Sequence, residues 1–249
     1  MYTLYEKRMI AELNVWKRRM RREPSFSGVL AQRLQDRINR VIPERVHQGF
    51  TMAVKQMTRA VLFGAGFTTR ATINHESMEA CEAAVRERVV FYRNTAAAEG
   101  AVTGAGGILL GLADFPLWLT LKMKMLFEIA SHYGHDTSQL HERIYILHIF
   151  ELCFSSARHR HKVFEILANW EEYRKTLPEE IHAFDWRTFQ REYRDYLDVA
   201  KLLQLVPGIG AAVGLVVNHR LTTRLGHTAM NAYRLRWLAA SKTQKRLGE

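Results

Sequence analysis

The sequence contains little of what disulfide-stabilised, all-β or membrane-spanning proteins require. Its 249 residues include 2 cysteines, Cys81 and Cys153, too few for a disulfide framework or a CxxC zinc module. Only 5 prolines are present, and strand-like alternation of polar and apolar residues is missing, which argues against an all-β fold. No uncharged apolar run reaches the ~20 residues of a membrane-spanning helix. The N-terminus carries charges at Glu6, Lys7 and Arg8, which is not the pattern of a secretory signal.

Acidic side chains are scarce at both ends of the chain. The sequence has 36 Lys and Arg against 25 Asp and Glu, a net charge of +11. Residues 1–48 hold 11 basic and 5 acidic side chains, and residues 218–249 hold 7 and 1, so each end carries +6 while the middle is nearly neutral. Positive ends of this kind are typical of proteins that meet an anionic surface, either phospholipid headgroups or nucleic-acid phosphates.

Residues 1–23 predict a basic amphipathic helix. Apolar side chains recur every three or four residues from Tyr2 to Met20, which is the spacing of one helical face. Such a helix can pack against the protein's own core, lie on a membrane or contact nucleic acid, and the spacing leaves the three alternatives open. We expect cationic and aromatic side chains of both ends to face a membrane surface. They are Lys7, Arg8, Trp16, Lys17, Arg18, Arg19, Arg21, Arg22, Tyr233, Arg234, Arg236 and Trp237.

Helical periodicity continues through the rest of the chain. We expect one all-α domain of about eight helices over residues 24–241, followed by a basic tail over 242–249. Apolar stripes predict helices over 44–63 and 74–99. The run ERIYILHIFELCF, residues 142–154, is apolar nearly all round and predicts a central buried helix.

Two apolar segments, residues 95–121 and 202–218, carry glycine at helical spacing. Because glycine costs roughly 1 kcal/mol relative to Ala at a helix position, its repetition along one edge indicates close packing of helix backbones, a glycine zipper. We expect two glycine-rich helical hairpins at the centre of the bundle, the first turning at residues 114–116 and followed by a helix that ends at Gly134. Partial entry into a bilayer interface is the alternative. The packing glycines are Gly100, Gly104, Gly107, Gly111, Gly210 and Gly214.

Recognised catalytic and nucleotide-binding motifs are missing. GAGGILLG lacks the GK[ST] ending of a phosphate loop, and neither GxSxG nor HExxH occurs. Four histidines fall within 17 residues but without a recognised metal spacing, so we expect no metal and no other cofactor. These histidines are His132, His135, His141 and His148.

Three acidic residues stand in apolar surroundings, namely Glu99, Asp114 and Glu151. Buried carboxylates need cationic or hydrogen-bonding partners, and they cluster both in structural networks and at functional sites. The sequence leaves both roles open, and no nucleophile with a nearby base accompanies them. We therefore expect no catalytic residue and no enzymatic activity.

Several segments resemble the EcsC family. The match is carried by EGAVTGAGGILLGLADFPLWLTLKMKMLFEIASHYGHD (99–136), ERIYILHIFELCFSS (142–156) and LVPGIGAAVGLVVNHRLTTRLGHTAMNAYRLRWL (205–238), with weaker similarity over 38–50 and 61–70. The resemblance implies an accessory role beside a bacterial ABC transporter linked to protein secretion and intramembrane proteolysis. The family has no established reaction, so the resemblance implies no catalytic residue. Residues before 24 lie outside the segments that carry it.

Together these features predict a non-enzymatic accessory protein bound peripherally to the cytoplasmic face of a bacterial membrane. Its expected partners are an anionic membrane surface and, as the resemblance allows, the membrane subunit of an ABC transporter. Two alternatives remain. A nucleic-acid-binding helical protein would share the charge pattern but lacks any base-reading motif, so no specific nucleic acid is expected. An enzyme would use Glu99, Asp114 and a histidine.

Overall fold

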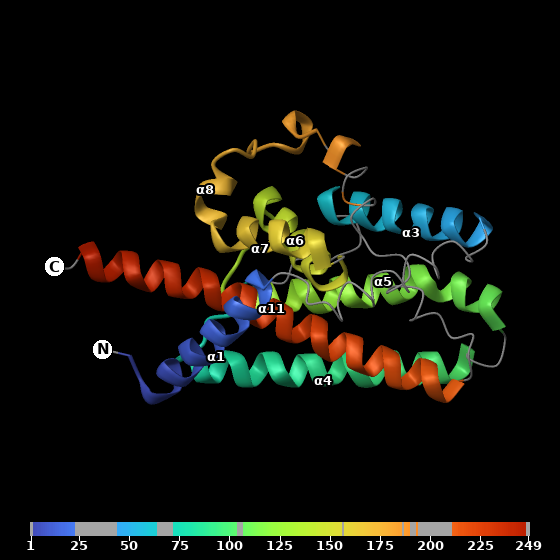
Figure 1. Cartoon of the computed structure of the whole chain (residues 1–249), viewed down its shortest axis with the longest axis horizontal. Helices are drawn as coiled ribbons and strands as arrows, with labels where there is room; N and C mark the ends of the chain where they lie inside the picture. Colours follow the sequence, from blue (N-terminus) through green and yellow to red (C-terminus); the bar gives the residue numbers. More distant parts are fainter. Residues whose placement is uncertain are drawn as a thin grey trace.

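The described part of the chain is built from helices joined by turns, and it contains no strand. The computed structural model describes residues 2–22, 44–63, 72–103, 107–155, 157–185, 187–189, 193 and 211–247. The α-helices are α1 (Leu4–Arg21), α3 (Glu44–Phe63), α4 (Met78–Thr103), α5 (Gly107–His132), α6 (Leu140–Phe154), α7 (Ala157–Ala168), α8 (Trp170–Arg174) and α11 (Ala211–Leu247), and a 3₁₀ turn covers Ile181–Ala183 (Figure 1). The predicted all-α fold class is confirmed.

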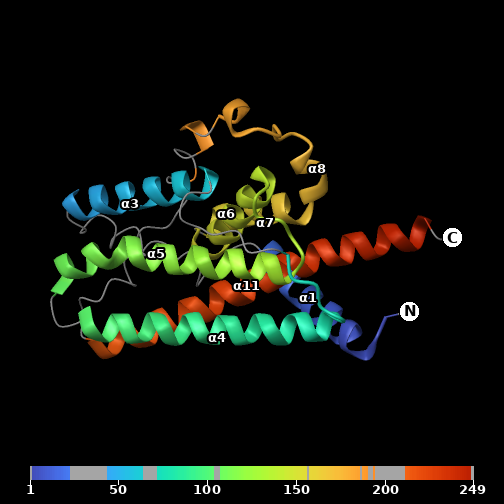
Figure 2. The same ribbon diagram turned by 180° about the vertical axis from the view of Figure 1, so that it is seen from behind.

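Three long helices run along the molecule. α4 packs against both α5 and α11, while α3 covers another side of α5 (Figures 1 and 2). α1 crosses α11 in the half of the molecule where both termini lie. The C-terminal end of α4 and the N-terminal ends of α5 and α11 lie at the opposite end. Among the described helices, none combines the length and apolar character that crossing a bilayer requires.

α6 forms the centre of the core, as its sequence predicts. Thirteen of its fifteen residues are buried, and they include polar side chains at Glu142, His148 and Glu151. The helix contacts α3, α5, α7 and α11. A helix surrounded on this many sides has no face left for water, which explains why it is apolar nearly all round.

α5 ends at a glycine C-cap. Gly134 has a φ of 79°, the left-handed region that glycine adopts without strain. Its N–H donates to the Ser131 carbonyl at 3.0 Å, and the His135 N–H donates to the Ala130 carbonyl at 3.0 Å, the two hydrogen bonds of a Schellman motif. The predicted helix end at Gly134 is therefore confirmed.

The predicted hairpin turn at residues 114–116 is wrong, because α5 runs through these residues without a break. Proline inside a helix costs about 3 kcal/mol. Phe115, Trp118 and Leu119 are buried beside Pro116, and burying large apolar side chains contributes about 1.5–3 kcal/mol each. Packing of this face therefore outweighs the local penalty of the proline.

The predicted glycine zipper lies where side-chain packing is not described, and it stays a prediction. Gly104 and Gly210 fall outside the described residues. The backbone places Gly100 near the end of α4, Gly107 and Gly111 near the start of α5, and Gly214 near the start of α11. These helix ends gather at one end of the bundle, called the glycine-rich end from here on (Figure 1).

A different glycine, Gly226, marks a close approach of α11 to α4. A Cβ atom on Gly226 would lie 2.5 Å and 2.7 Å from the two methyl carbons of Val89 and 3.2 Å from its Cβ. Rotation of the Val89 side chain moves its methyls but leaves the 3.2 Å contact with its Cβ unchanged. The buried Val89 side chain thus occupies the space that any other residue at position 226 would need.

Gly226→Ala should lower the free energy of unfolding by about 1–2 kcal/mol, because steric overlap with Val89 exceeds the gain in helix propensity. Gly49→Ala in α3 is the control, since nothing lies within 4 Å of a Cβ there. It should raise stability by about 0.5–1 kcal/mol. Urea unfolding measures both, and the loss at position 226 should shrink in a Val89→Ala background. A Gly226→Ala variant at least as stable as the parent would contradict this account.

Candidate functional site

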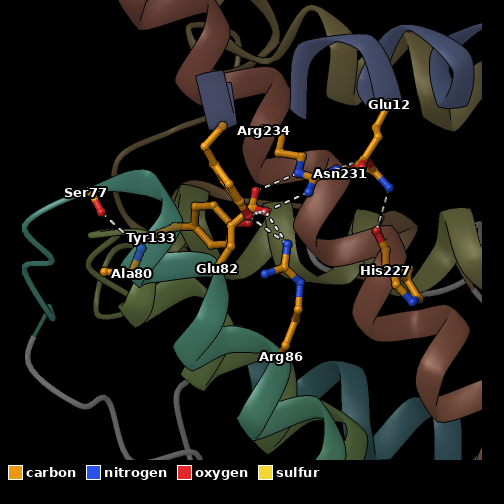
Figure 3. Close-up of polar contacts among 10 residues, drawn as sticks. Glu12, Ser77, Ala80, Glu82, Arg86, Tyr133, His227, Asn231 and Arg234 are labelled. Atoms are coloured by element: carbon orange, nitrogen blue, oxygen red, sulfur yellow. Dashed lines mark hydrogen bonds and ion pairs between the residues drawn. The ribbon is translucent and has the colours of Figure 1, made fainter. Parts of the chain in front are cut away.

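A buried ion pair between α4 and α11 organises the first group of polar side chains. Arg234 Nε donates to Glu82 Oε1 at 2.6 Å, and Arg234 Nη2 donates to Glu82 Oε2 at 2.6 Å (Figure 3). Neither side chain is more than 6% exposed. The Tyr5 hydroxyl of α1 donates to Oε2 at 2.5 Å, and Glu12 of α1 lies 3.1 Å from Arg234 Nη1. The pair therefore joins α1, α4 and α11 at one point.

Further partners complete this Glu82 cluster. Arg86 Nη2 donates to Glu82 Oε2 at 3.1 Å, and the Tyr133 hydroxyl lies 3.3 Å from Oε1 (Figure 3). Burial by itself would raise the pKa of Glu82, but hydrogen bonds from Arg234 and Tyr5 outweigh burial and hold the pKa below its ordinary value. For Arg234, burial acts to lower the pKa, and the hydrogen bonds to Glu82 raise it. Both groups are charged at neutral pH.

A second buried pair forms between α6 and α11. Arg236 Nη1 and Nη2 donate to Glu142 Oε2 and Oε1 at 2.6 and 2.7 Å, and the guanidinium lies 4.9 Å from the centre of the Tyr145 ring. His135 Nδ1 is 3.8 Å and His141 Nε2 is 3.5 Å from the same carboxylate. Burial lowers the pKa of His135 to about 4, and nearby Arg236 acts in the same direction. His135 is therefore neutral at pH 7.

These pairs correct part of the predicted membrane surface. Arg234, Arg236 and Tyr233 face the interior: Arg234 is 5% exposed and Tyr233 is fully buried, while the Arg236 side chain is 8% exposed. Trp16 and Trp237 are half-buried, Trp16 against Phe164 and Trp237 against Tyr2. Arg234 and Arg236 are two residues apart on α11, yet each guanidinium binds a different buried carboxylate. The periodicity of the sequence does not reveal this pairing.

Of the three predicted buried acids, the structure describes the side chain of Glu151. Glu151 is 4% exposed and lies 2.8 Å from His148 Nδ1 and 2.7 Å from His159 Nε2. Burial acts to raise its pKa, but the two histidines outweigh burial and hold the pKa below its ordinary value. Glu99 and Asp114 lie in α4 and α5, but their side chains are not among those described, so they are placed only along the backbone.

The remaining predicted cations form a basic end. Lys17 lies near Arg21 of its own helix and Lys242 of α11, and its pKa is lowered by partial burial and by the repulsion of these two charges. Arg18, Arg19 and Arg22 are exposed. Arg21 forms an ion pair with Glu165 of α7 at 2.9 Å. We call this group the basic end; it comprises Lys17, Arg18, Arg19, Arg21, Arg22 and Lys242. The structure thus brings cations of both chain ends together, while Lys7 and Arg8 are exposed on the first half of α1.

A cleft of about 1020 Å³ opens beside the two ion pairs. Its walls come from the first turn of α1, residues 73–78, the C-terminal end of α5, α8 and the last third of α11. Six lining residues carry rings, namely His75, His132, Tyr133, His135, Tyr233 and Trp237, and three carry carboxylates, Glu6, Glu76 and Glu171. Cys81 also lines the cleft, but burial raises the pKa of its thiol to about 12, and its Sγ contacts the His132 carbonyl at 3.2 Å. A thiol in this state is a poor nucleophile at neutral pH.

The four histidines that cluster in the sequence do not meet at one point in the fold. His135 and His141 approach the same Glu142 carboxylate, while His132 pairs with His75 at 2.9 Å and His148 binds Glu151. Within the described ranges, no group of three or more His, Cys, Asp or Glu side chains is placed to hold a metal ion.

Sequence reasoning missed Glu82 and Glu142. A signal for Glu82 exists, because Glu82 lies four residues after Met78 and three before Val85 and so occupies the same stripe of α4 that the core covers. Likewise Arg234 stands in the apolar run AMNAYRLRWL. A charge inside an apolar stripe indicates a buried partner of opposite sign, although the sequence does not say which one.

Glu82→Ala should cost about 3 kcal/mol of stability or more, because it leaves Arg234 buried without its carboxylate. Glu87→Ala is the matched control in the same helix, since Glu87 is exposed, and it should change stability by no more than about 0.5 kcal/mol. Urea unfolding of both variants and of Glu82→Ala/Arg234→Ala makes the measurement. The double variant should lose less than the sum of the single losses, and simple additivity would refute the pairing.

Acid should destabilise the protein in two pH ranges. The folded pKa of His135, about 4, is below its ordinary value of 6.5, so the unfolded chain takes up the proton first and stability falls as pH drops from about 6.5 to about 4. Glu82, Glu142 and Glu151 have lowered pKa values, so their contribution is lost at lower pH, below the ordinary range of a glutamate near 4.3. His135→Phe keeps a ring against Tyr233 and should reduce the slope of the first range only. Part of that slope should remain, because burial also lowers the pKa of His141.

Urea midpoints measured at several values between about pH 7 and pH 4 check this expectation. His182→Phe, at an exposed position, is the control and should leave the profile unchanged. An unaltered slope above about pH 4.5 in His135→Phe would contradict the assignment.

Comparison with known proteins supports the resemblance to the EcsC family. The EcsC protein family matches residues 7–238, a span that includes most of α1. The chain is 42% identical to Protein EcsC of Bacillus subtilis (strain 168) over 231 residues, or 92% of this chain and 95% of that protein. It is 31% identical to the uncharacterized protein YdbA of the same organism over 145 residues, 57% of this chain and 53% of YdbA. No solved structure matches. On the strength of a match that spans nearly its whole length, this chain belongs to the EcsC protein family.

Proposed function

We propose that this chain is a non-enzymatic accessory protein that acts at the cytoplasmic face of a bacterial membrane, beside an ABC transporter or secretion pathway. Membership of the EcsC family carries the proposal, since it suggests a protein associated with an ABC-transporter operon. The buried acids speak against a role in catalysis, because Glu82, Glu142 and Glu151 are each held by hydrogen-bonding side chains that keep them ionised.

Peripheral contact through the basic end is the mode of membrane binding that we favour. Each Lys or Arg near an anionic lipid surface contributes about 1 kcal/mol. The exposed guanidinium groups of Arg18, Arg19 and Arg22 supply this attraction. Lys17 already experiences repulsion from Arg21 and Lys242, and a negatively charged surface would relieve it.

The length of α11 separates the glycine-rich end from the basic end. Gly214 and Lys242 lie on this one continuous helix. At about 1.5 Å per residue they are separated by roughly 42 Å along the axis, more than the thickness of a bilayer core. If α11 stands upright on the membrane, contact at the basic end leaves the glycine-rich end far from the surface, and binding at the basic end then needs no insertion of apolar helices.

Reversing the charge of the basic end tests this mode of membrane binding. In liposome flotation the parent protein should bind vesicles that contain anionic lipid, and binding should weaken as salt rises from about 0.1 to about 0.5 M because screening shortens the range of the attraction. Arg18→Glu/Arg19→Glu/Arg22→Glu should reduce binding at the lower salt by at least about tenfold, corresponding to the loss of several contributions of about 1 kcal/mol.

Lys124→Glu/Arg220→Glu/Arg224→Glu is the control, because it makes the same change in net charge at three exposed positions outside the basic end. It should retain most of the binding. Equal loss in both triple variants would show that net charge alone governs binding and would refute a specific surface. Binding of duplex DNA with no binding of anionic vesicles would favour the nucleic-acid alternative instead.

A further inference from the structure

The cleft has the size and the lining of a small-molecule site. Its volume of about 1020 Å³ compares with the roughly 300–1000 Å³ of typical ligand pockets. It is built from parts of the chain far apart in sequence, residues 73–78, the turn after α5 and the face of α11 that carries Trp237 and Ala240. The rigid C-cap at Gly134 and the Glu82 and Glu142 ion pairs surround it, so its walls are firmly positioned.

Flat rings form much of this lining. Tyr233 stacks on Tyr133 and on His135, with ring centres 5.1 Å apart in both cases. His75 and His132 stack at 5.2 Å, and their Nε2 and Nδ1 atoms lie 2.9 Å apart. Planar π faces pack best against another planar group in offset or edge contact. The surface is therefore suited to a flat apolar molecule.

Tyr133, Tyr233 and His135 carry no charge at neutral pH. Burial raises the pKa of both Tyr133 and Tyr233 well above 10, and burial lowers the pKa of His135 to about 4. Arg236 directs two of its donors to Glu142, which neutralises its charge. Most of the interior thus favours a ligand with an apolar body over a strongly charged one.

Two buried donors on one face of α11 have no acceptor. Neither the Tyr233 hydroxyl nor Arg236 Nε has a hydrogen-bond partner. Arg236 Nε lies 3.8 Å from the Glu171 carboxylate, which is too long for a hydrogen bond. Leaving a buried donor unsatisfied costs about 1–3 kcal/mol. Residues three apart on a helix lie on the same face, so one acceptor group can approach both.

We propose that this cleft binds a flat, mainly apolar organic molecule that carries a hydrogen-bond-accepting oxygen, as in a sulfonate, carboxylate or carbonyl group. Its rings pack against His75 and Trp237, which are partly exposed, and its oxygen accepts from the Tyr233 hydroxyl and Arg236 Nε. Glu171, which is 54% exposed, turns aside to admit the acceptor. This inference does not depend on membrane contact.

Two fluorescent probes separate the contribution of the ligand's apolar body from that of its hydrogen-bond acceptor. The sulfonate 1-anilinonaphthalene-8-sulfonate has the flat body and the acceptor, and N-phenyl-1-naphthylamine has the same body without the acceptor. The folded full-length protein should bind the sulfonate saturably at one site, and more tightly than the amine. Ala240→Trp fills the cleft and should weaken the binding of both probes by at least about tenfold.

Ala83→Trp is the matched control, because Ala83 is exposed on α4 and does not line the cleft. It should bind both probes as the parent does. Absence of saturable binding to the parent, or equal binding by Ala240→Trp and Ala83→Trp, would overturn the site. Near-UV circular dichroism of each variant verifies that the dye reports on a folded protein.

Tyr233→Phe tests the acceptor. It removes the hydroxyl and should weaken binding of the sulfonate by about fivefold to tenfold, which corresponds to one hydrogen bond, with no effect on the amine. Because that hydroxyl has no partner in the protein, the variant should unfold at the same urea concentration as the parent or a higher one. A lower unfolding midpoint, or equal loss of both probes, would refute the role of the Tyr233 hydroxyl.

Discussion

The buried ion pair of Glu82 and Arg234 is the constraint on which the arrangement of α1, α4 and α11 depends. Removing two charges from water costs several kcal/mol each, and the cost is recovered only where the geometry is close to ideal. Here two hydrogen bonds of 2.6 Å join the groups, and Tyr5 and Arg86 add further donors. Such a pair allows one register of α11 against α4, because a slip of one turn would leave both charges buried and unpaired. It also fixes α1, whose Tyr5 and Glu12 contact the same two side chains.

The pairing changes the meaning of the charge pattern in the sequence. The positive C-terminal end includes Arg234 and Arg236, but their carboxylate partners lie 152 and 94 residues earlier in the chain, in the nearly neutral middle. Part of the apparent cationic excess therefore stabilises the core. Among the described residues, one group of the remaining cations lies at the basic end, while Lys7, Arg8, Arg220 and Arg224 are exposed elsewhere. A count of charges along the chain predicts that the ends are positive, yet only the fold distinguishes cations in the core from those available to an anionic partner.

Local features of this fold were predictable from the sequence, and features that depend on a neighbouring helix were not. The burial of α6 follows from its own composition, and its end at Phe154 and the cap of α5 at Gly134 follow from nearby residues. By contrast, α5 passes through Pro116 because distant side chains bury Phe115 and Trp118, against the local preference for a break. Gly226 gives no periodic signal at all, since its importance comes from Val89 on another helix. The cleft could not be predicted for the same reason, because five separate segments build it.

α11 joins the close packing on α4, the two buried ion pairs and both proposed binding surfaces in one continuous helix. From its start at the glycine-rich end it contacts α4 through Gly226, pairs with Glu82 and Glu142, lines the cleft and ends in the basic end. Thr243 lines the cleft and its neighbour Lys242 belongs to the basic end, so the two proposed binding surfaces meet in the same helical turn. A protein held on a membrane by its basic end would thus present the cleft close to the headgroup region. Flat amphipathic molecules concentrate at that depth, where an apolar body and a polar oxygen are both accommodated. The proposed ligand chemistry and the proposed location are therefore physically compatible, although each rests on its own observations.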